Sequence, residues 1–306
     1  MTERLKNMLR VFSAMSLIFF ISCQNGRINE KLINNMSSNE RESVVFSAVS
    51  KNQKYYSEVA DVAEYIQEMS VYDEELDSTY IIHITLPPDF DKNRYYPMYM
   101  MTDGIWRLSD HAELRPLMVN GEIEDIILVS IGCNYGINAE KTETRLVELV
   151  QKSGLFLNFI TDNLAPYLGE LYNINYKRSA LMGHSLGGLF VYYAVFSHDK
   201  YKNEPFNYYV IASPSFFMTN NKSNWKYGDI EKDYFKRNKK LEKEIYLTVG
   251  DKEYGDILPN VNNFLQRSKK YGITTLDYEV FDGTHSGYVK PMLRKSLLKF
   301  YKKGDF

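Results

Sequence analysis

The sequence predicts an α/β fold in which a single, mostly parallel sheet is covered by helices on both faces. Short apolar runs, typical of strands buried on both faces, alternate with segments whose apolar residues recur at helical spacing. The chain has 306 residues and 44% hydrophobic content, which suits one large domain or two small ones. No internal repeat is visible, so we expect one doubly wound domain over residues 51–306.

The expected strands are short apolar or alternating runs bounded by turn residues. In chain order they cover residues 59–71, 79–86, 95–101, 123–131, 178–182, 206–212, 244–249 and 276–281. The expected helices cover residues 155–171, 189–196, 261–271 and 290–301. Pro166 lies inside the first helix and is expected to kink it. The polar stretch 218–243 is expected to be either a surface helical excursion or a partial lid, and the sequence does not decide between the two.

The first residues of the chain have the pattern of a targeting segment. Three basic residues lie within the first ten positions, and the apolar run 11–21 that follows is too short to span a bilayer comfortably. The run leads into Cys23, and the pattern resembles a bacterial lipoprotein signal in which this cysteine is lipidated. We therefore expect a signal peptide with a lipobox over 1–23, a polar tether over 24–50, and an extracytoplasmic protein anchored to the membrane. An ordinary secretion signal and an uncleaved anchor are the alternatives.

Composition argues against several kinds of partner. The net charge of −2 gives no electrostatic case for binding nucleic acid. The two cysteines cannot form a disulfide framework or a cysteine-rich metal site, and neither His-x-x-x-His nor Cys-x-x-Cys occurs. No Gly-x-Gly-x-x-Gly run opens a helix. We therefore expect neither a metal nor a cofactor.

Residues 183–188 read Gly-His-Ser-Leu-Gly-Gly and carry the clearest chemical signal in the chain. A run that can form a buried strand precedes them, and a run long enough for a packed helix follows. Strand, sharp turn and helix are the context of a nucleophile elbow, whose strained serine leaves room only for glycine two positions either side. Ser185 is therefore the candidate nucleophile. The turn also directs the Leu186 N–H toward an oxyanion forming beside Ser185.

A serine hydroxyl needs a base within hydrogen-bond reach, and the base needs a group that orients it. Of the five histidines, His285 fits best, because it follows the last expected strand, where hydrolases with such an elbow place the base. His111 is expected in a loop, solvated at the surface, with contact to substrate as the alternative. The remaining histidines are expected within a strand, inside the elbow pointing away from the serine, and at the far end of the following helix: His83, His184 and His198.

The acid is expected in the loop after the strand that precedes the last one. This loop offers Asp251, Glu253 and Asp256, and spacing alone does not choose among them. Asp251 directly follows the glycine that ends the strand, whereas Glu253 lies farther along and has a longer side chain. The choice of acid therefore stays open at the level of spacing.

Blocks of sequence along the chain point to a known family. They are Leu-Pro-Pro-Asp-Phe at 86–90, Tyr-Pro-Met-Tyr-Met-Met-Thr-Asp-Gly at 96–104, the elbow at 183–188, Ser-Pro-Ser at 213–215 and Phe-Asp-Gly-Thr-His at 281–285. In this order they resemble the putative-esterase family of α/β hydrolases over about residues 55–302. The family includes siderophore esterases, feruloyl and acetyl-xylan esterases, S-formylglutathione hydrolase and mycolyltransferases. The Ser-Pro-Ser-Phe block and the Gly-x-x-Glu loop are most similar to the siderophore-esterase branch.

The resemblance implies an α/β-hydrolase fold and a serine carboxylic-ester hydrolase that acts through an acyl-enzyme. It implies Ser185 as the nucleophile and His285 as the base. It selects Glu253 as the acid, because relatives commonly carry the acid three positions after the glycine that ends the strand. The N–H groups of Leu186 and Ile105 are the implied oxyanion hole. The implied substrate is an extracytoplasmic ester, either a siderophore lactone or an acylated glycan.

Other features of the resemblance refine this reading. Arg145 resembles an arginine that precedes the long helix in several relatives, and it is expected either to meet substrate or to form a structural ion pair. Asp103-Gly104 stands where many esterases have His-Gly, which argues against a plain formylglutathione hydrolase. The stretch 218–243 matches no block of the family. An acyltransferase on the same residues and a non-catalytic binding module are the alternative functions, and the complete order of serine, acid and histidine argues against the binding module.

Overall fold

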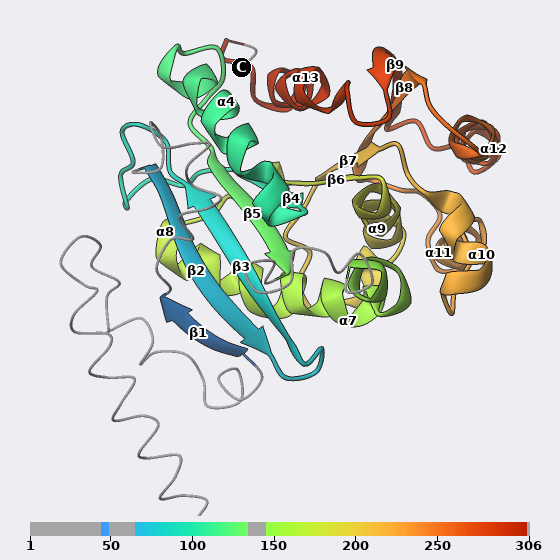
Figure 1. Cartoon of the computed structure of the whole chain (residues 1–306), viewed down its shortest axis with the longest axis horizontal. Helices are drawn as coiled ribbons and strands as arrows, with labels where there is room; N and C mark the ends of the chain where they lie inside the picture. Colours follow the sequence, from blue (N-terminus) through green and yellow to red (C-terminus); the bar gives the residue numbers. More distant parts are fainter. Residues whose placement is uncertain (1–43, 49–64, 134–144, 305–306) are drawn as a thin grey trace, which may run out of the picture.

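The computed structural model describes residues 44–48, 65–133 and 145–304, and within them one nine-stranded sheet runs across the molecule (Figure 1). From edge to edge the strands lie in the order β1-β2-β3-β5-β4-β6-β7-β8-β9. Strands β4 to β9 are mutually parallel, whereas β1, β2 and β3 pair antiparallel, so the predicted mostly parallel sheet is confirmed. The strands are β1 (Val44–Ala48), β2 (Ile66–Asp73), β3 (Ser78–Thr85), β4 (Met98–Thr102), β5 (Ile127–Cys133), β6 (Ala180–His184), β7 (Tyr208–Ala212), β8 (Glu244–Lys252) and β9 (Leu276–Thr284).

Helices cover both faces of this sheet (Figure 1). Successive residues of β4 alternate between two apolar layers: Tyr99 and Met101 pack toward α4 and α13, and Met98 and Met100 pack toward α7, α8, α9 and α12. The predicted doubly wound arrangement is therefore confirmed. The longer helices are α4 (Leu108–Val119), α7 (Ser153–Asn158), α8 (Ala165–Tyr172), α9 (Leu186–Val195), α11 (Asp229–Arg237), α12 (Ile257–Lys270) and α13 (Val289–Tyr301). The short helical segments are η2 (Gly104–Arg107), η3 (Val147–Gln151), η4 (Phe159–Leu164), η5 (Tyr176–Arg178), η6 (His198–Lys200), η7 (Phe216–Met218) and α10 (Thr219–Lys222).

The strand order reverses between β4 and β6, which makes this place a topological switch point of the sheet. From β4 the chain passes to β5 on one side and later returns to β6 on the other, so the carboxyl ends of β4 and β6 lie next to each other. Open α/β sheets bind ligands at such a switch point. Asp103 follows β4 there, and Ser185 follows β6.

Most predicted strands and helices are present, with ends that differ by a few residues. The first predicted strand, 59–71, is shifted along the chain: β2 begins at Ile66, and residues 59–64 lie outside the described residues. The predicted long helix is helical from end to end, but a π-helical stretch, η4, divides it. Pro166 stands at the start of α8 directly after this stretch, where a missing N–H interrupts little α-helical bonding.

The expectation that His111 lies in a loop, solvated at the surface, is wrong. It lies in α4 and is 1% exposed, held by Thr85 of β3 and Ser130 of β5. Helix α4 buries polar as well as apolar residues, among them Asp110, so it lacks the apolar stripe that identifies a helix from sequence. The two hydroxyl partners of His111 come from distant strands that only the folded sheet brings together.

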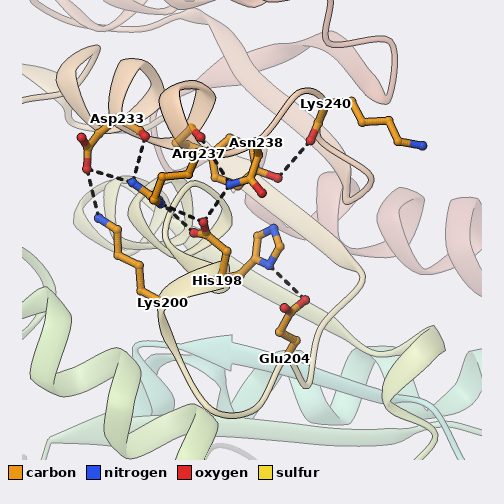
Figure 2. A network of polar contacts seen from close by, with 9 residues as sticks. His198, Lys200, Glu204, Asp233, Arg237, Asn238 and Lys240 are labelled. Carbon is orange, nitrogen blue, oxygen red and sulfur yellow. Dashed lines mark hydrogen bonds and ion pairs between the residues drawn. The ribbon is translucent and has the colours of Figure 1, made fainter.

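The segment 218–243 is a packed helical excursion, the first of the two predicted alternatives. On one side Arg237 of α11 pairs with Asp199 of η6, with its Nε and Nη2 each 2.9 Å from a carboxylate oxygen (Figure 2). On the other side the fully buried Glu231 pairs with Arg267 of α12, at 2.7 and 3.0 Å. Ion pairs thus fasten the excursion to the body of the protein at both faces of α11.

Within residues 65–133 and 145–304, together with β1, no helix has the length and apolar character that a membrane span requires. The predicted signal peptide with Cys23 lies outside the described residues, and so do residues 24–43 and 49–50 of the predicted tether 24–50. Residues 44–48, which also fall within that predicted tether, instead form β1 and pair with β2 at the edge of the sheet. The lipid attachment therefore stays a prediction from sequence.

Candidate active site

The turn between β6 and α9 holds Ser185 in a strained backbone conformation, with φ 61° and ψ −115°. A Cβ atom on Gly183 would lie 2.2 Å from the Gly187 carbonyl oxygen, so the turn accepts only glycine at position 183. The Ser185 N–H donates to the Ala212 carbonyl at 2.9 Å, which ties the turn to β7. The structure therefore has the sharp strand-turn-helix geometry that the sequence predicts.

His285 and Glu253 meet at the carboxyl ends of β9 and β8. Nδ1 of His285 lies 2.6 Å from Oε2 of Glu253. Nε2 of His285 is buried and has no hydrogen-bond partner among the described residues. The imidazole is thus oriented by the carboxylate on one side and has its other nitrogen available for proton transfer.

Ser185 and His285 line the same pocket, but no hydrogen bond joins them in this structure. The hydroxyl of Ser185 instead lies 3.2 Å from the hydroxyl of Ser215. Catalytic hydrogen bonds are often long or poorly aligned before substrate binds. The structure brings the two predicted residues together at one rim of the sheet, with the serine hydroxyl turned toward Ser215.

The carboxylate of Glu253 is held on both oxygens. Its Oε1 accepts hydrogen bonds from the hydroxyl of Ser213 and, at 3.1 Å, from the N–H of Gly250. Burial by itself would raise the pKa of Glu253, but the hydrogen bonds from His285, Ser213 and Gly250 outweigh it and lower that pKa below its usual value. Glu253 is therefore an ionised partner for His285 at neutral pH.

The other two candidate acids lie elsewhere in the same loop. Asp251 accepts the Gly283 N–H at 2.8 Å and is exposed. Asp256 is exposed and directly precedes α12. Of the three carboxylates that spacing left open, Glu253 is the one that contacts His285.

His184, inside the elbow, supports His285 from a third direction. Its Nε2 lies 2.7 Å from the backbone oxygen of His285, and the two rings are 4.5 Å apart between centroids. Burial, and then the neighbouring His285, lower the pKa of His184 to about 3, so its ring is neutral and Nε2–H donates. The sequence assigned this histidine no role beyond pointing away from Ser185.

Arg145 makes the structural ion pair that was one of its two predicted roles. It binds both carboxylate oxygens of Asp103, one of them at 3.0 Å, and donates to the His184 carbonyl at 3.1 Å. Burial opposes ionisation of Asp103, but the guanidinium of Arg145 wins and lowers the pKa of that carboxyl. Asp103 has φ 66°, a conformation that few residues other than glycine adopt, so the ion pair holds a strained loop beside the pocket.

The pocket at these strand ends has a volume of about 380 Å³. Its walls include two exposed aromatic rings, Trp106 at 52% and Tyr254 at 57% exposure, and two cationic side chains, Arg107 and Lys290. The Tyr254 ring lies 4.7 Å from that of His285, edge to face. Arg145 also lines the pocket while it holds Asp103.

The predicted oxyanion donors lie at the starts of helical segments beside this pocket. Leu186 is the first residue of α9, and Ile105 is the second residue of η2. The first N–H groups of a helix have no partner within that helix. The segments place these two backbone positions after the adjacent strands β6 and β4.

Sequence reasoning missed Ser213, Ser215 and Tyr288. Ser213 has φ 41° and lies between Glu253 and the Tyr288 hydroxyl, which is 2.7 Å from its Oγ. The Ser-Pro-Ser block at 213–215 is a usable signal, since it matches a family block, but the match gives no role to its hydroxyls. Tyr288 had no local signal. Among the described residues, no group of three or more histidine, cysteine or acidic side chains could hold a metal ion.

Comparisons with known proteins find curated relatives that match short stretches of the chain. The chain is 40% identical over 60 residues to the ferri-bacillibactin esterase BesA of Bacillus subtilis, covering 20% of this chain and 19% of that protein. It is 39% identical over 67 residues to the siderophore enterobactin esterase of Emericella nidulans, covering 21% of each. The chain thus matches about a fifth of the length of these curated relatives.

A solved structure resembles this protein in fold over most of the chain. The BES protein from Bacillus cereus superposes with a TM-score of 0.64 at 22% identity, over 78% of this chain and 96% of that one. This likeness confirms the predicted α/β-hydrolase fold. Residues 74–290, well over half of the chain, match the family model described as putative esterase. The chain therefore belongs to the putative esterase family.

Proposed function

We propose that this protein is a serine esterase that hydrolyses a siderophore lactone through an acyl-enzyme on Ser185. The observation that carries the proposal is the arrangement of His285, whose Nδ1 is held by Glu253 at 2.6 Å while its buried Nε2 has no partner among the described residues. A histidine oriented in this way, in one pocket with a strained serine, has the geometry of a general base for a serine nucleophile.

In the acylation step, the Ser185 hydroxyl turns from Ser215 toward His285 and attacks the ester carbonyl. Nε2 of His285 takes the hydroxyl proton as the Oγ–C bond forms. The N–H groups of Leu186 and Ile105 bind the oxyanion of the tetrahedral intermediate. When the intermediate collapses, the C–O bond to the alcohol breaks, and the alkoxide leaves with the proton from His285.

Deacylation repeats the sequence with water as the nucleophile. His285 takes a proton from water, the resulting hydroxide attacks the acyl carbonyl, and the Ser185 oxygen leaves with that proton. Glu253 stays ionised throughout and stabilises the imidazolium that forms in each half-reaction. His184 and Ser213 hold the base and the acid in place and do not take part in proton transfer.

The choice of a siderophore ester rests on the relatives and on the walls of the pocket. Two relatives are named as esterases of ferri-bacillibactin and of enterobactin. In this chain, Trp106 and Tyr254 offer exposed aromatic faces. Three cationic side chains line the pocket against two carboxylates, Asp103 and Asp110, which leaves an excess of one positive charge; of the cations, Arg107 pairs with Asp110 and Lys290 with Glu113. Aromatic rings stack on aryl groups, and cations attract an anionic ligand. This combination suits an aryl-bearing, anionic ester better than a neutral acylated glycan.

The test is a hydrolysis screen of the protein lacking residues 1–23. The substrates are a catecholate siderophore lactone with and without iron, acetylated xylan, a feruloylated sugar and p-nitrophenyl acetate. We expect the lactone to be hydrolysed with the highest kcat/KM and Ser185→Ala to hydrolyse none of the substrates. Preferential hydrolysis of a glycan ester would contradict the substrate assignment, and an active Ser185→Ala would contradict the mechanism.

We also propose that the protein is extracytoplasmic and anchored to the membrane through acyl chains on Cys23. The basic start, the short apolar run and the cysteine at its end support the proposal. Acyl chains contribute about 0.8 kcal/mol per buried CH₂, so they retain an otherwise water-exposed protein at a bilayer. Cys23→Ser should move the protein from the membrane fraction to the aqueous fraction, and unchanged fractionation would refute lipidation at this residue.

A further inference from the structure

A chain of buried hydrogen bonds runs from strand β3 to the backbone beside the pocket. The Thr85 hydroxyl lies 2.8 Å from Nδ1 of His111, and Nε2 of His111 lies 3.0 Å from the hydroxyl of Ser130. Ser130 in turn donates to the carbonyl oxygen of Gly104 at 3.3 Å. The three side chains are buried. None of these three side chains lines the pocket. The series of hydrogen bonds therefore ends on the peptide group between Gly104 and Ile105.

The donors and acceptors in this series of hydrogen bonds can be assigned in only one way. A carbonyl oxygen only accepts, so the Ser130 hydroxyl gives its proton to Gly104. Ser130 must then accept from Nε2–H of His111, which leaves Nδ1 of His111 to accept the Thr85 hydroxyl proton. Burial, and then the neighbouring His83, lower the pKa of His111 to about 3, so the ring stays neutral near pH 7. One tautomer of His111 therefore satisfies every bond in the chain.

The Gly104–Ile105 peptide, where this series of hydrogen bonds ends, carries the Ile105 N–H, one of the two proposed oxyanion donors. In a trans peptide the carbonyl and the N–H point in opposite directions, and the described residues contain no cis peptide. Holding the Gly104 oxygen therefore fixes the direction of the Ile105 N–H. A Cβ on Gly104 would lie 2.7 Å from the Gly132 nitrogen, so this backbone lies directly against β5, the strand that carries Ser130.

We propose that Ser130 and His111 are positioning residues that orient the Ile105 N–H for the oxyanion formed at Ser185. The proposal rests on the serine esterase function proposed above. Neither side chain touches substrate. Their effect passes through the Gly104–Ile105 peptide plane, and it matters most when negative charge develops on the substrate oxygen. This gives a reason for two buried hydroxyls and a buried neutral histidine between α4 and the sheet.

The experiment compares Ser130→Ala with Ser296→Ala, a matched control. Ser296 is also fully buried, but it bonds Tyr99 and Leu293, away from the pocket. For p-nitrophenyl acetate we expect Ser130→Ala to lower kcat about 10- to 100-fold with KM within about two-fold, since removal of a whole oxyanion donor costs about 10²–10³. The affinity for a boronic acid that adds to Ser185 should fall by the same factor. Ser296→Ala should keep both values.

Further variants separate positioning from a general structural role. His111→Gln keeps a donor that can reach Ser130 and should retain more activity than His111→Leu. Ser130→Cys, a milder change, covers the case in which Ser130→Ala does not fold, and it should lower kcat and boronate affinity together. Folded Ser130 variants with wild-type kcat and boronate affinity would overturn the positioning role while leaving the esterase proposal intact. A folded wild type that hydrolyses no ester and binds no boronate would overturn both.

Discussion

Nδ1 of His285 lies 2.6 Å from Oε2 of Glu253, across the carboxyl ends of the last two parallel strands. The second oxygen of Glu253 is held by Ser213 and by the Gly250 N–H, so the carboxylate has one orientation. The backbone oxygen of His285 is held by His184. These contacts fix the imidazole in position and tautomer, and they leave its Nε2 without a hydrogen-bond partner among the described residues, in a side chain that lines the same pocket as Ser185.

The contact between Glu253 and His285 makes the choice of acid testable. Glu253→Gln removes the charge that stabilises the imidazolium, and we expect kcat/KM for p-nitrophenyl acetate to fall about 10²–10⁴-fold. Asp251→Asn changes an exposed carboxylate of the same loop and should stay within about three-fold of wild type, because it removes no contact to His285. Equal losses of kcat/KM in the two variants would show that the effect comes from a general change in the loop and not from the contact between Glu253 and His285.

The stability of the protein should depend on pH through two buried histidines. Folding lowers the pKa of His111 and of His184 to about 3 from an ordinary value of 6.5, so the unfolded chain binds more protons than the folded one between these pH values. The contribution of these two histidines to the stability of the fold is therefore fully present above pH 6.5 and is lost as the pH falls toward 3. Between pH 7.5 and pH 5, each of the two histidines should lower the free energy of unfolding by about 2 kcal/mol.

Urea unfolding at pH 7.5 and pH 5 measures this loss. His111→Gln replaces one of the two titrating groups and should remove about half of it. The variant and the wild type differ only at position 111, so changes in other groups cancel in the comparison. Identical pH dependence in the two proteins would contradict a buried neutral His111.

Arg145 should matter for stability because its partner is buried. Arg145→Met leaves the Asp103 carboxylate buried and unpaired, and we expect it to lower the free energy of unfolding by about 3–5 kcal/mol. Arg94→Met is the control: it breaks the exposed pair with Asp125, 3.4 Å apart, and should cost at most about 1 kcal/mol. If Arg145→Met lowers the free energy of unfolding no more than Arg94→Met does, the Asp103 carboxylate is not buried and dependent on Arg145.

The exposed ring of Trp106 should affect the choice of substrate more than the chemistry. Trp106→Ala is expected to raise KM for an aryl-bearing ester about five- to 100-fold, the value of one lost stacking contact, with little change for p-nitrophenyl acetate turnover at saturation. Tyr95→Ala is the control, since Tyr95 is 71% exposed and does not line the pocket. Equal KM changes for the two variants would remove Trp106 from the binding surface.

The sequence predicted the parts of the site that local pattern encodes. The turn at Ser185 is defined by its glycines and by the runs on either side, and His285 by its place after the last strand. The doubly wound sheet followed from alternating segments. These signals depend on neighbours in the chain, and the structure has each of them.

The rest of the site depends on contacts between distant segments. Ser213 and Tyr288 meet at 2.7 Å although they are separated by 75 positions. His111 read as a surface residue because nothing near it in sequence shows that Thr85 and Ser130 will satisfy both of its ring nitrogens. A buried polar residue is recognisable only once its partners are known.

The central claim is that Ser185 becomes covalently acylated, and a fluorophosphonate probe tests it most directly. The folded wild type should give a single adduct that mass spectrometry maps to Ser185, with no adduct in Ser185→Ala and about 10²-fold slower labelling in His285→Ala. A folded wild type that forms no adduct, or an adduct on another residue, would contradict covalent catalysis at this serine.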